Sequence, residues 1–216
     1  MNSKCLCLCF RQQMPSSTRG QLTIEKTPSY FITSDVPERI KNMSRDVRLL
    51  LVVRDPVTRA VSDYAQAKAR KPELPRFEQL AFSDANFSRV NTSWGAIRIS
   101  LYSRHVDQWL LHFSRDQLLF INGEDLIRNP GDVMRRVQSF LQLDAVISQQ
   151  HFSFNSSKGF PCLLKPKDKG RAHCLTNGKG RAHPELDSRA LESLRRFFQP
   201  FNELFFSKIG QRFEWD

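Results

Sequence analysis

The sequence predicts an α/β fold in which a parallel central sheet is flanked by helices. Two short apolar runs, residues 47–53 and 117–123, have the length and composition of strands. Each is followed by a segment of helical periodicity that starts at a proline, residues 56–71 and 130–143. Strands that alternate with helices are typical of parallel sheets, and ligands bind such sheets beyond the carboxyl ends of the strands.

The first of these strand–helix units contains the run VRLLLVV, followed directly by Arg54, Asp55 and Pro56. An uninterrupted apolar run favours a strand that is buried on both faces. Pro56 fits the first turn of a helix, because no backbone N–H is needed there. The helix that follows has one apolar face, formed by Val57, Ala60, Val61 and Tyr64. Arg54 is therefore expected at the edge of the sheet where ligands bind.

Three further segments complete the predicted domain. Residues 96–113 have the periodicity of a single amphipathic helix, and residues 151–175 carry the turn signals of an irregular hairpin. A last helix is expected over residues 187–209, with a break at Pro200 because proline cannot donate a helical hydrogen bond. No apolar stretch approaches the 18 residues of a membrane span, so a transmembrane segment is not expected.

Composition describes one basic globular domain. The chain has 216 residues, 40% of them hydrophobic and 25% charged, which is typical of a folded protein. Its net charge of +11 favours an acidic partner: nucleic acid, an anionic polysaccharide, a phosphorylated cofactor or a membrane surface. No known nucleic-acid-binding motif is present, so nucleic acid is not expected among the partners.

The cysteines and the asparagine sequons point to an oxidising compartment. Cys162 and Cys174 bracket a segment rich in proline, lysine and glycine, and a disulfide there is favoured over free or metal-linked thiols. His173 and His183 lie nearby, but the C-x₂-C spacing of zinc sites is missing, and no metal is expected. Four N-x-[ST] sequons are candidate glycosylation sites: Asn42, Asn86, Asn91 and Asn155.

Residues 1–20 do not resemble the start of a folded domain. Cys5, Cys7 and Cys9 alternate with apolar residues in a run that is too short for a secretory signal. The run is either an acylation site or an alternative start without a designed role. We expect residues 1–20 to be disordered and residues 21–216 to form the domain.

The segment RDPVTRAVSDY, residues 54–64, is suited to a phosphate monoester. The guanidinium of Arg54 offers a fork of donors that matches phosphate oxygens, and Ser62 adds a neutral donor. The helix N-terminus adds a partial positive charge. The alternative is a structural ion pair between Arg54 and Asp55, with Ser62 merely exposed.

This segment resembles the 3′-phosphate-binding segment of the Golgi sulfotransferases that use 3′-phosphoadenylyl sulfate (PAPS). Five further segments, in the same order, resemble the heparan sulfate glucosamine 3-O-sulfotransferases: EKTPSYF (25–31), NTSWGAIRISLYSRHVDQWLLHF (91–113), KGFPCL (158–163), CL (174–175) and KGRAHP (179–184). The resemblance covers residues 21–216. It implies a P-loop-kinase-like sulfotransferase fold, PAPS as the donor and transfer of its sulfonate to the 3-OH of glucosamine in heparan sulfate. It also implies a monomer in the Golgi lumen.

Residue roles follow from the resemblance position by position. The cofactor-binding residues it implies are Arg54, Ser62, Lys179, Gly180, Arg181, Ala182 and His183. The last five would form a loop over the nucleotide, held by a Cys162–Cys174 disulfide. The substrate-binding residues it implies are Lys26, Thr27, Pro28, Ser29, Trp94 and Gly95. Lys26 would lie nearest the transferred group, as an auxiliary to catalysis.

The sequence departs from the family pattern in its upstream part. The family has a Gly-Gly-Thr loop around the 5′-phosphosulfate, followed by a glutamate that serves as general base, and neither is matched here. No acidic residue occurs before Glu25, which is not expected to replace that base. We therefore expect a truncated or alternative product whose central sheet lacks its first strand and exposes an edge. A longer form would be a type II membrane protein. The alternative function is heparan sulfate or nucleotide binding without catalysis.

Overall fold

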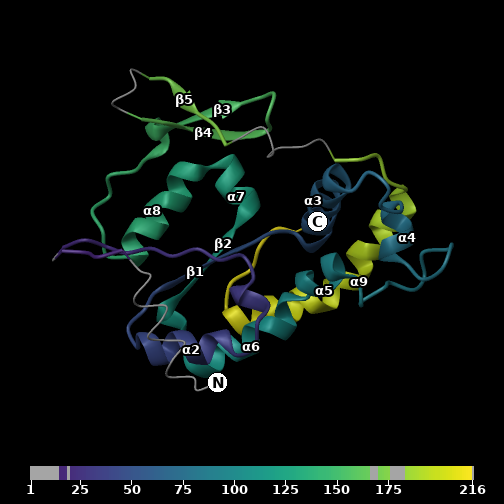
Figure 1. Cartoon of the computed structure of the whole chain (residues 1–216), viewed down its shortest axis with the longest axis horizontal. Coiled ribbons are helices and arrows are strands. Elements are labelled where there is room, and N and C mark those ends of the chain that lie inside the picture. Colours follow the sequence, from purple (N-terminus) through teal and green to yellow (C-terminus); the bar gives the residue numbers. More distant parts are fainter. Residues whose placement is uncertain (1–14, 19, 166–169, 176–182, 216) are drawn as a thin grey trace.

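A computed structural model of the chain describes residues 15–18, 20–165, 170–175 and 183–215 (Figure 1). Its centre is a parallel pair of strands, β1 (Leu49–Val53) and β2 (Leu118–Asn122). Their register pairs the last residue of β1, Val53, with the last residue of β2, Asn122. The predicted α/β class with parallel strands is confirmed, and both carboxyl ends lie at the same edge.

Helices cover the two faces of this pair unequally. Helices α2 (Val36–Met43), α6 (Tyr102–His112) and α9 (Ser188–Ile209) pack on one face around Leu51, Val53 and Phe120. On the other face, α7 (Gly123–Arg128) and α8 (Pro130–Phe140) pack around Ile121. The helices α2 and α7 have no counterpart in the sequence-based prediction.

The prediction that the first strand is buried on both faces is wrong. Leu51 and Val53 are buried, but Leu50 is 38% exposed and Val52 is 58% exposed. Val52 is in register with Ile121, and α8 packs against Ile121 with Val133 and Val137. Helix α8 therefore covers the β2 side of this face, while the side chains of β1 beside it stay exposed. Among the described residues β1 pairs with β2 alone, which leaves its second edge without a strand.

A second core lies under the helix that follows β1. It joins α3 (Pro56–Arg70), α4 (Phe77–Ala81) and α5 (Gly95–Ser100) to the first half of α9. Its largest fully buried side chains include Phe77, Ile97 and Phe198. The predicted helix at Pro56 is confirmed, and this core fixes its position beside β1. Three short 3₁₀ helices occur elsewhere: η1 (Tyr30–Ile32), η2 (Arg115–Gln117) and η3 (Gln149–His151).

The predicted single helix over residues 96–113 is two helices. Helix α5 ends at Ser100 and α6 begins at Tyr102, because Leu101 has a ψ of 64° that is not helical. The hydroxyl of Ser100 donates to the carbonyl oxygen of Pro56 at 3.2 Å, which ties the break to the start of α3. No glycine or proline marks this position, so local sequence signals could not show it.

The predicted break at Pro200 does not end the last helix. Helix α9 runs from Ser188 to Ile209 with Pro200 inside it. Proline removes one hydrogen bond from a helix, but burial of the flanking side chains opposes unwinding. Phe198 and Phe205, on either side of Pro200, are both buried in the core.

The expected hairpin over residues 151–175 is a separate three-stranded antiparallel sheet. Its strands are β3 (Phe152–Asn155), β4 (Phe160–Leu164) and β5 (Ala172–His173), in the order β3-β4-β5. Figure 1 shows this sheet beside α7 and α8, away from α6 and α9. None of the helices built from described residues combines the length and the apolar character needed to cross a membrane.

Candidate functional site

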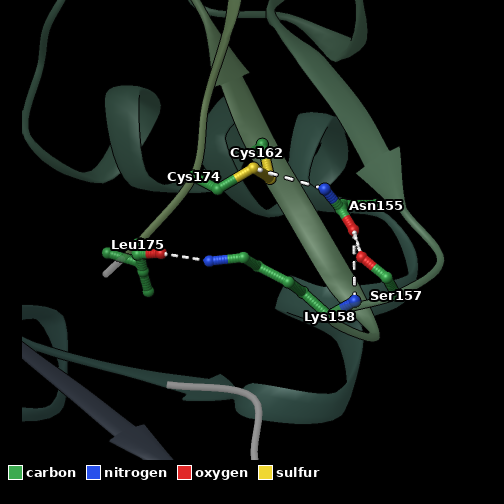
Figure 2. The surroundings of a disulfide bond; sticks show 6 residues. All are labelled: Asn155, Ser157, Lys158, Cys162, Cys174 and Leu175. Carbon is green, nitrogen blue, oxygen red and sulfur yellow. Dashed lines mark hydrogen bonds between the residues drawn. A yellow bond between two sulfur atoms is a disulfide. The ribbon is translucent and has the colours of Figure 1, made fainter. Parts of the chain in front are cut away.

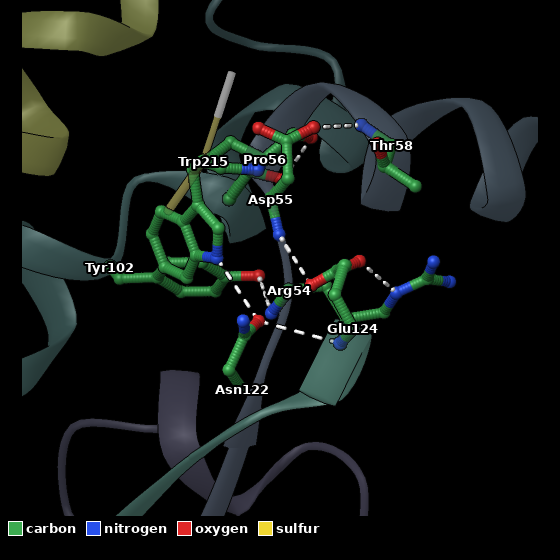
Figure 3. Close-up of polar contacts among 9 residues, drawn as sticks. Arg54, Asp55, Pro56, Thr58, Tyr102, Asn122, Glu124 and Trp215 are labelled. Atoms are coloured by element: carbon green, nitrogen blue, oxygen red, sulfur yellow. Dashed lines mark hydrogen bonds and ion pairs between the residues drawn. The ribbon is translucent and has the colours of Figure 1, made fainter. Parts of the chain in front are cut away.

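The carboxyl ends of β1 and β2 bring together residues that are far apart in the sequence. Since Val53 and Asn122 are in register, the next residues of the two strands, Arg54 and Gly123, are neighbours. Glu124 follows in the first turn of α7. Figure 3 shows Arg54, Asn122 and Glu124 grouped at this edge, which is where ligands bind in parallel sheets.

Arg54 forms an ion pair with Glu124. Its Nε atom donates to Glu124 Oε1 at 2.8 Å, and the two side chains are 30% and 16% exposed. Neither Nη atom of Arg54 bonds to any other residue in the described ranges. In Figure 3 these two nitrogens lie on the side of the guanidinium away from the Glu124 carboxylate. The open half of the fork can therefore receive an anion.

The backbone at Arg54 is fixed by two side chains. The N–H of Arg54 donates to the hydroxyl oxygen of Tyr102 at 3.4 Å, and the N–H of Asp55 donates to Glu124 Oε2 at 3.3 Å. Burial raises the pKa of Tyr102 to about 12, so its hydroxyl stays protonated at physiological pH. Both oxygens of Glu124 are thus used, one by the side chain of Arg54 and one by the next peptide group.

Asp55 is the N-cap of α3 and is not the ion-pair partner of Arg54. Its Oδ1 atom accepts a hydrogen bond from the N–H of Thr58 at 2.7 Å. Burial raises its pKa, and the hydrogen bond from Thr58 opposes that rise. The sequence left open an ion pair between Arg54 and Asp55. Arg54 does form an ion pair, but its partner is Glu124. The positive end of α3 is also compensated by Asp55, so it contributes less to anion binding than the sequence suggested.

Asn122 joins the site to the C-terminal end of the chain. Its Oδ1 atom accepts hydrogen bonds from the N–H of Glu124 at 3.4 Å and from Nε1 of Trp215 at 3.1 Å (Figure 3). The ring of Trp215 is stacked on Phe205 of α9, with centroids 6.1 Å apart. Packing of the terminal segment therefore fixes the first residues of α7.

Ser62 and His183 lie on the elements that surround Arg54. Ser62 is half-buried in the second turn of α3, one helical turn beyond Thr58, and its hydroxyl bonds to none of the described residues. Burial lowers the pKa of His183, and the positive charge of Arg54 lowers it further. The role of His183 in cofactor binding, which the resemblance implied, stays a prediction. Lys179, Gly180, Arg181 and Ala182 lie outside the described residues.

The disulfide links the small sheet to the segment that precedes His183. Cys162 on β4 and Cys174 are bonded with an S–S distance of 2.07 Å, as expected from the sequence (Figure 2). The Nδ2 atom of Asn155 donates to Cys174 Sγ at 3.6 Å, and Nζ of Lys158 donates to the carbonyl oxygen of Leu175 at 2.8 Å. The chain is thus held at Cys174 and Leu175, directly before a stretch that lies outside the described residues.

The proposed glycan-contacting residues form two separate groups. Lys26, Thr27, Pro28 and Ser29 are all exposed, in a segment that leads into η1. The hydroxyl of Thr27 donates to Glu25 Oε1 at 2.6 Å, so this carboxylate has a partner within its own segment. Trp94 and Gly95 lie at the start of α5. The ring of Trp94 packs edge-on against Phe77 at 5.4 Å, which gives it a structural role whether or not it also contacts a glycan.

Sequence reasoning missed Gly123, Glu124, Tyr102 and Arg195. Arg195 lies on α9, and its charge lowers the pKa of Asp55, which opposes the effect of burial. One signal in the sequence could have identified Glu124. If the two predicted strands are parallel neighbours, an acidic residue directly after the second strand lies beside the residue that follows the first strand, which is Arg54. Within the described ranges, no group of three or more His, Cys, Asp or Glu side chains could hold a metal ion.

Together the fold and the site define an α/β protein in which an arginine with two open Nη atoms lies at the ends of two parallel strands. The sulfotransferase domain model matches residues 13–211, and the chain therefore belongs to the sulfotransferase domain family. A solved sulfotransferase from Alicyclobacillus acidocaldarius has a similar fold, with a TM-score of 0.61 and 20% identity, covering 86% of this chain and 63% of that one.

Curated relatives come from one branch of sulfotransferases. The chain is 49% identical over 207 residues to mouse heparan sulfate glucosamine 3-O-sulfotransferase 3B1, which covers 96% of this chain and 53% of the relative. It is 48% identical to human 3-O-sulfotransferase 3B1, with the same coverage, and 47% identical to mouse 3-O-sulfotransferase 6, covering 60% of that protein. The chain spans about half the length of the first two relatives.

Proposed function

We propose that this chain binds PAPS through its 3′-phosphate and that its reaction is sulfonate transfer to the 3-OH of glucosamine in heparan sulfate. The observation that carries the proposal is the geometry of Arg54, which directly follows β1. Its Nε donates to Glu124, and both of its Nη atoms are directed away from that carboxylate. The relatives named as heparan sulfate glucosamine 3-O-sulfotransferases supply the substrate class.

The proposed nucleotide site combines charged and neutral donors. The Nη pair of Arg54 would grip the 3′-phosphate, and the Ser62 hydroxyl would add a neutral hydrogen bond. His183 has a lowered pKa in the ligand-free protein, so it would donate as a neutral imidazole or take up a proton beside the anion. Lys179, Gly180, Arg181 and Ala182 would cover the nucleotide.

The proposed glycan surface is the exposed segment that contains Lys26. Heparan sulfate is a polyanion, so its binding to a chain with a net charge of +11 releases counterions. Lys26 would contact the transferred group, and Thr27, Pro28 and Ser29 would line the saccharide path together with Trp94 and Gly95. The disulfide and the four sequons support a further proposal, that the chain works in the Golgi lumen. That it works there as a monomer rests on the family resemblance alone.

The second candidate function is binding without transfer. A general base must come within about 2.6–3.2 Å of the attacking hydroxyl. No residue of this sequence matches the glutamate that the resembling family uses. The first acidic residue, Glu25, accepts a hydrogen bond from Thr27 and matches no base position in that family. The family resemblance thus supplies candidate residues for binding donor and glycan in this chain, but no candidate for the base.

Two assays on the same preparation distinguish these functions. Calorimetric titration with 3′-phosphoadenosine 5′-phosphate measures donor binding, and transfer of labelled sulfonate from PAPS to heparan sulfate measures turnover. Both functions predict that Arg54→Ala weakens nucleotide binding, since a charge-assisted pair is worth about 1.5–3 kcal/mol. Turnover supports transfer, whereas binding of nucleotide and glycan without turnover supports the second function. An Arg54→Ala variant with unchanged nucleotide affinity would contradict both.

A further inference from the structure

We infer that Gly123 and Glu124 act as positioning residues that set the direction of the Arg54 guanidinium, and with it the preference for nucleotides carrying a 3′-phosphate. The inference rests on the proposed function, because it assumes that Arg54 binds this phosphate. It adds the first two residues of α7, about 70 positions away along the chain, to a site otherwise placed after β1.

Gly123 provides the space through which the Arg54 side chain passes. A Cβ atom at position 123 would lie 2.6 Å from Cγ of Arg54, 3.2 Å from its Cδ and 3.3 Å from the carbonyl oxygen of Val53. Gly123 has no positive φ, so its conformation does not require glycine. The requirement is the close approach of the arginine stem, and any side chain at position 123 must displace it.

Glu124 fixes the orientation of the guanidinium at the end of that stem. Oε1 accepts from Arg54 Nε, and Oε2 accepts from the N–H of Asp55, so one carboxylate is bonded to two consecutive residues of β1's end. The N–H of Glu124 is itself held by Asn122 Oδ1. Because Nε is hydrogen-bonded to Glu124, the two Nη atoms point in a single direction. The side chain therefore loses less rotamer freedom when an anion binds than a free arginine would.

The charge of Glu124 has the opposite effect on phosphate affinity. A carboxylate beside the phosphate repels it, so removal of Glu124 both frees Arg54 and removes a negative charge. Gly123 carries no charge, and its substitution changes only the position of the arginine. Gly123→Ala is therefore the decisive variant, and Glu124→Ala is the second variant if Gly123→Ala fails to fold.

The measurement is the ratio of affinities for 3′-phosphoadenosine 5′-phosphate and adenosine 5′-monophosphate, which differ by the 3′-phosphate alone. We expect Gly123→Ala to lower this ratio about tenfold or more, the value of one charge-assisted hydrogen bond, while affinity for the monophosphate changes little. Glu124→Ala should lower the ratio below that of Glu124→Gln, which removes the same negative charge but keeps an amide oxygen that can accept from Arg54 Nε.

Gly131→Ala is the matched control. Gly131 also lies in the first turn of a helix, α8, and a Cβ atom there would come within 2.6 Å of the backbone nitrogen of Gln149. The overlap is as severe, but all three nearest atoms belong to Gln149 and none to Arg54. This variant should lose stability and keep the wild-type affinity ratio, which separates positioning from a general loss of structure.

The outcomes distinguish the inference from the function on which it rests. If the wild-type chain binds both nucleotides equally, the proposed phosphate site is wrong and the inference falls with it. If the wild type prefers the 3′-phosphate and this preference survives in Gly123→Ala, the positioning role alone is refuted. Where Gly123→Ala does not fold, equal ratios for Glu124→Ala and Glu124→Gln refute it. A drop in the ratio for Gly131→Ala equal to that for Gly123→Ala would refute it too.

Discussion

The small antiparallel sheet should depend on its disulfide more than on apolar packing. Among β3, β4 and β5, Cys162 is the one buried residue, so the sheet has little core of its own. Cys162 and Cys174 are separated by 12 positions. Closing a loop of that size removes unfolded-state entropy equivalent to about 3 kcal/mol. Converted to an equilibrium constant, this is a roughly 150-fold change in the population of the opened sheet.

Hydrogen exchange measures that population directly. In a Cys162→Ala/Cys174→Ala variant, amides of β3 and β4 should exchange roughly 100-fold faster, because opening of this sheet is local. Amides of α6 and α9, which pack on the other side of the parallel strands, should keep their protection. Asn155→Ala is the control, since it removes the side-chain hydrogen bonds of Asn155 to Cys174, Ser157 and Lys158 and leaves the disulfide in place. Its effect should be about tenfold or less.

Two results would refute this reasoning. Unchanged exchange in the double-alanine variant would mean that packing against α7 and η3 suffices to hold the sheet. Equal acceleration in α6 and α9 would mean that the sheet opens only when the whole domain unfolds. Local opening should also weaken nucleotide binding, because the segment that ends at His183 would lose its fixed starting point at Cys174.

Three further predictions concern pH and modification. Because the folded protein holds His183 with a lowered pKa and a bound phosphate favours the imidazolium, nucleotide binding should take up a proton at pH values between the lowered pKa of the free protein and the higher pKa of the complex. Calorimetry in buffers of different ionisation enthalpy measures that uptake, and His183→Gln should abolish it. Burial raises the pKa of Asp55 above 3.8, so the folded state binds the carboxyl proton more tightly than the unfolded state. Protonated Asp55 therefore stabilises the fold at low pH, and this contribution is lost as the pH rises through the raised pKa. Asp55→Asn keeps a helix-capping side chain and should become more stable relative to wild type as the pH rises through this range, as measured by urea unfolding. A stability difference between the two proteins that does not change with pH would contradict the argument. We expect a sequon to carry a glycan only where the side-chain amide of its asparagine is free. The Nδ2 atoms of Asn91 and Asn155 are not free, because they donate to the carbonyl oxygen of Leu80 and to Cys174 Sγ. Peptide mapping of chain expressed through the secretory pathway should find glycans at the two exposed sequons alone, Asn42 and Asn86.

The features predicted correctly from the sequence are those encoded within a few residues. The apolar runs, the prolines at the starts of α3 and α8, and the position of Arg54 after β1 each depend on neighbours in the chain. The break between α5 and α6 depends instead on the hydroxyl of Ser100, which bonds to Pro56 more than 40 positions away. The continuity of α9 through Pro200 likewise depends on buried aromatic residues of distant segments.

The candidate site also combines residues that local sequence identifies with residues that only the tertiary structure identifies. Arg54 could be chosen because strand ends carry ligands in this class of fold. Glu124 could be identified as its partner only from the parallel register that sets Val53 beside Asn122. The exposed face of β1 was missed for a related reason: an apolar run indicates what a strand could bury, whereas the helices that pack on it decide what is buried.

The pairing of charges changes what the net charge of +11 implies for function. At the strand ends Arg54 is paired with Glu124, and the buried carboxylate of Asp55 lies beside them, so the local positive charge is largely compensated. A phosphate is therefore recognised there by the direction of two Nη atoms more than by an excess of charge. The uncompensated cations must lie elsewhere on the chain, where direction matters less to a long polyanion. The proposed nucleotide binding would thus depend on geometry, and the proposed glycan binding would depend on the summed charge of the surface.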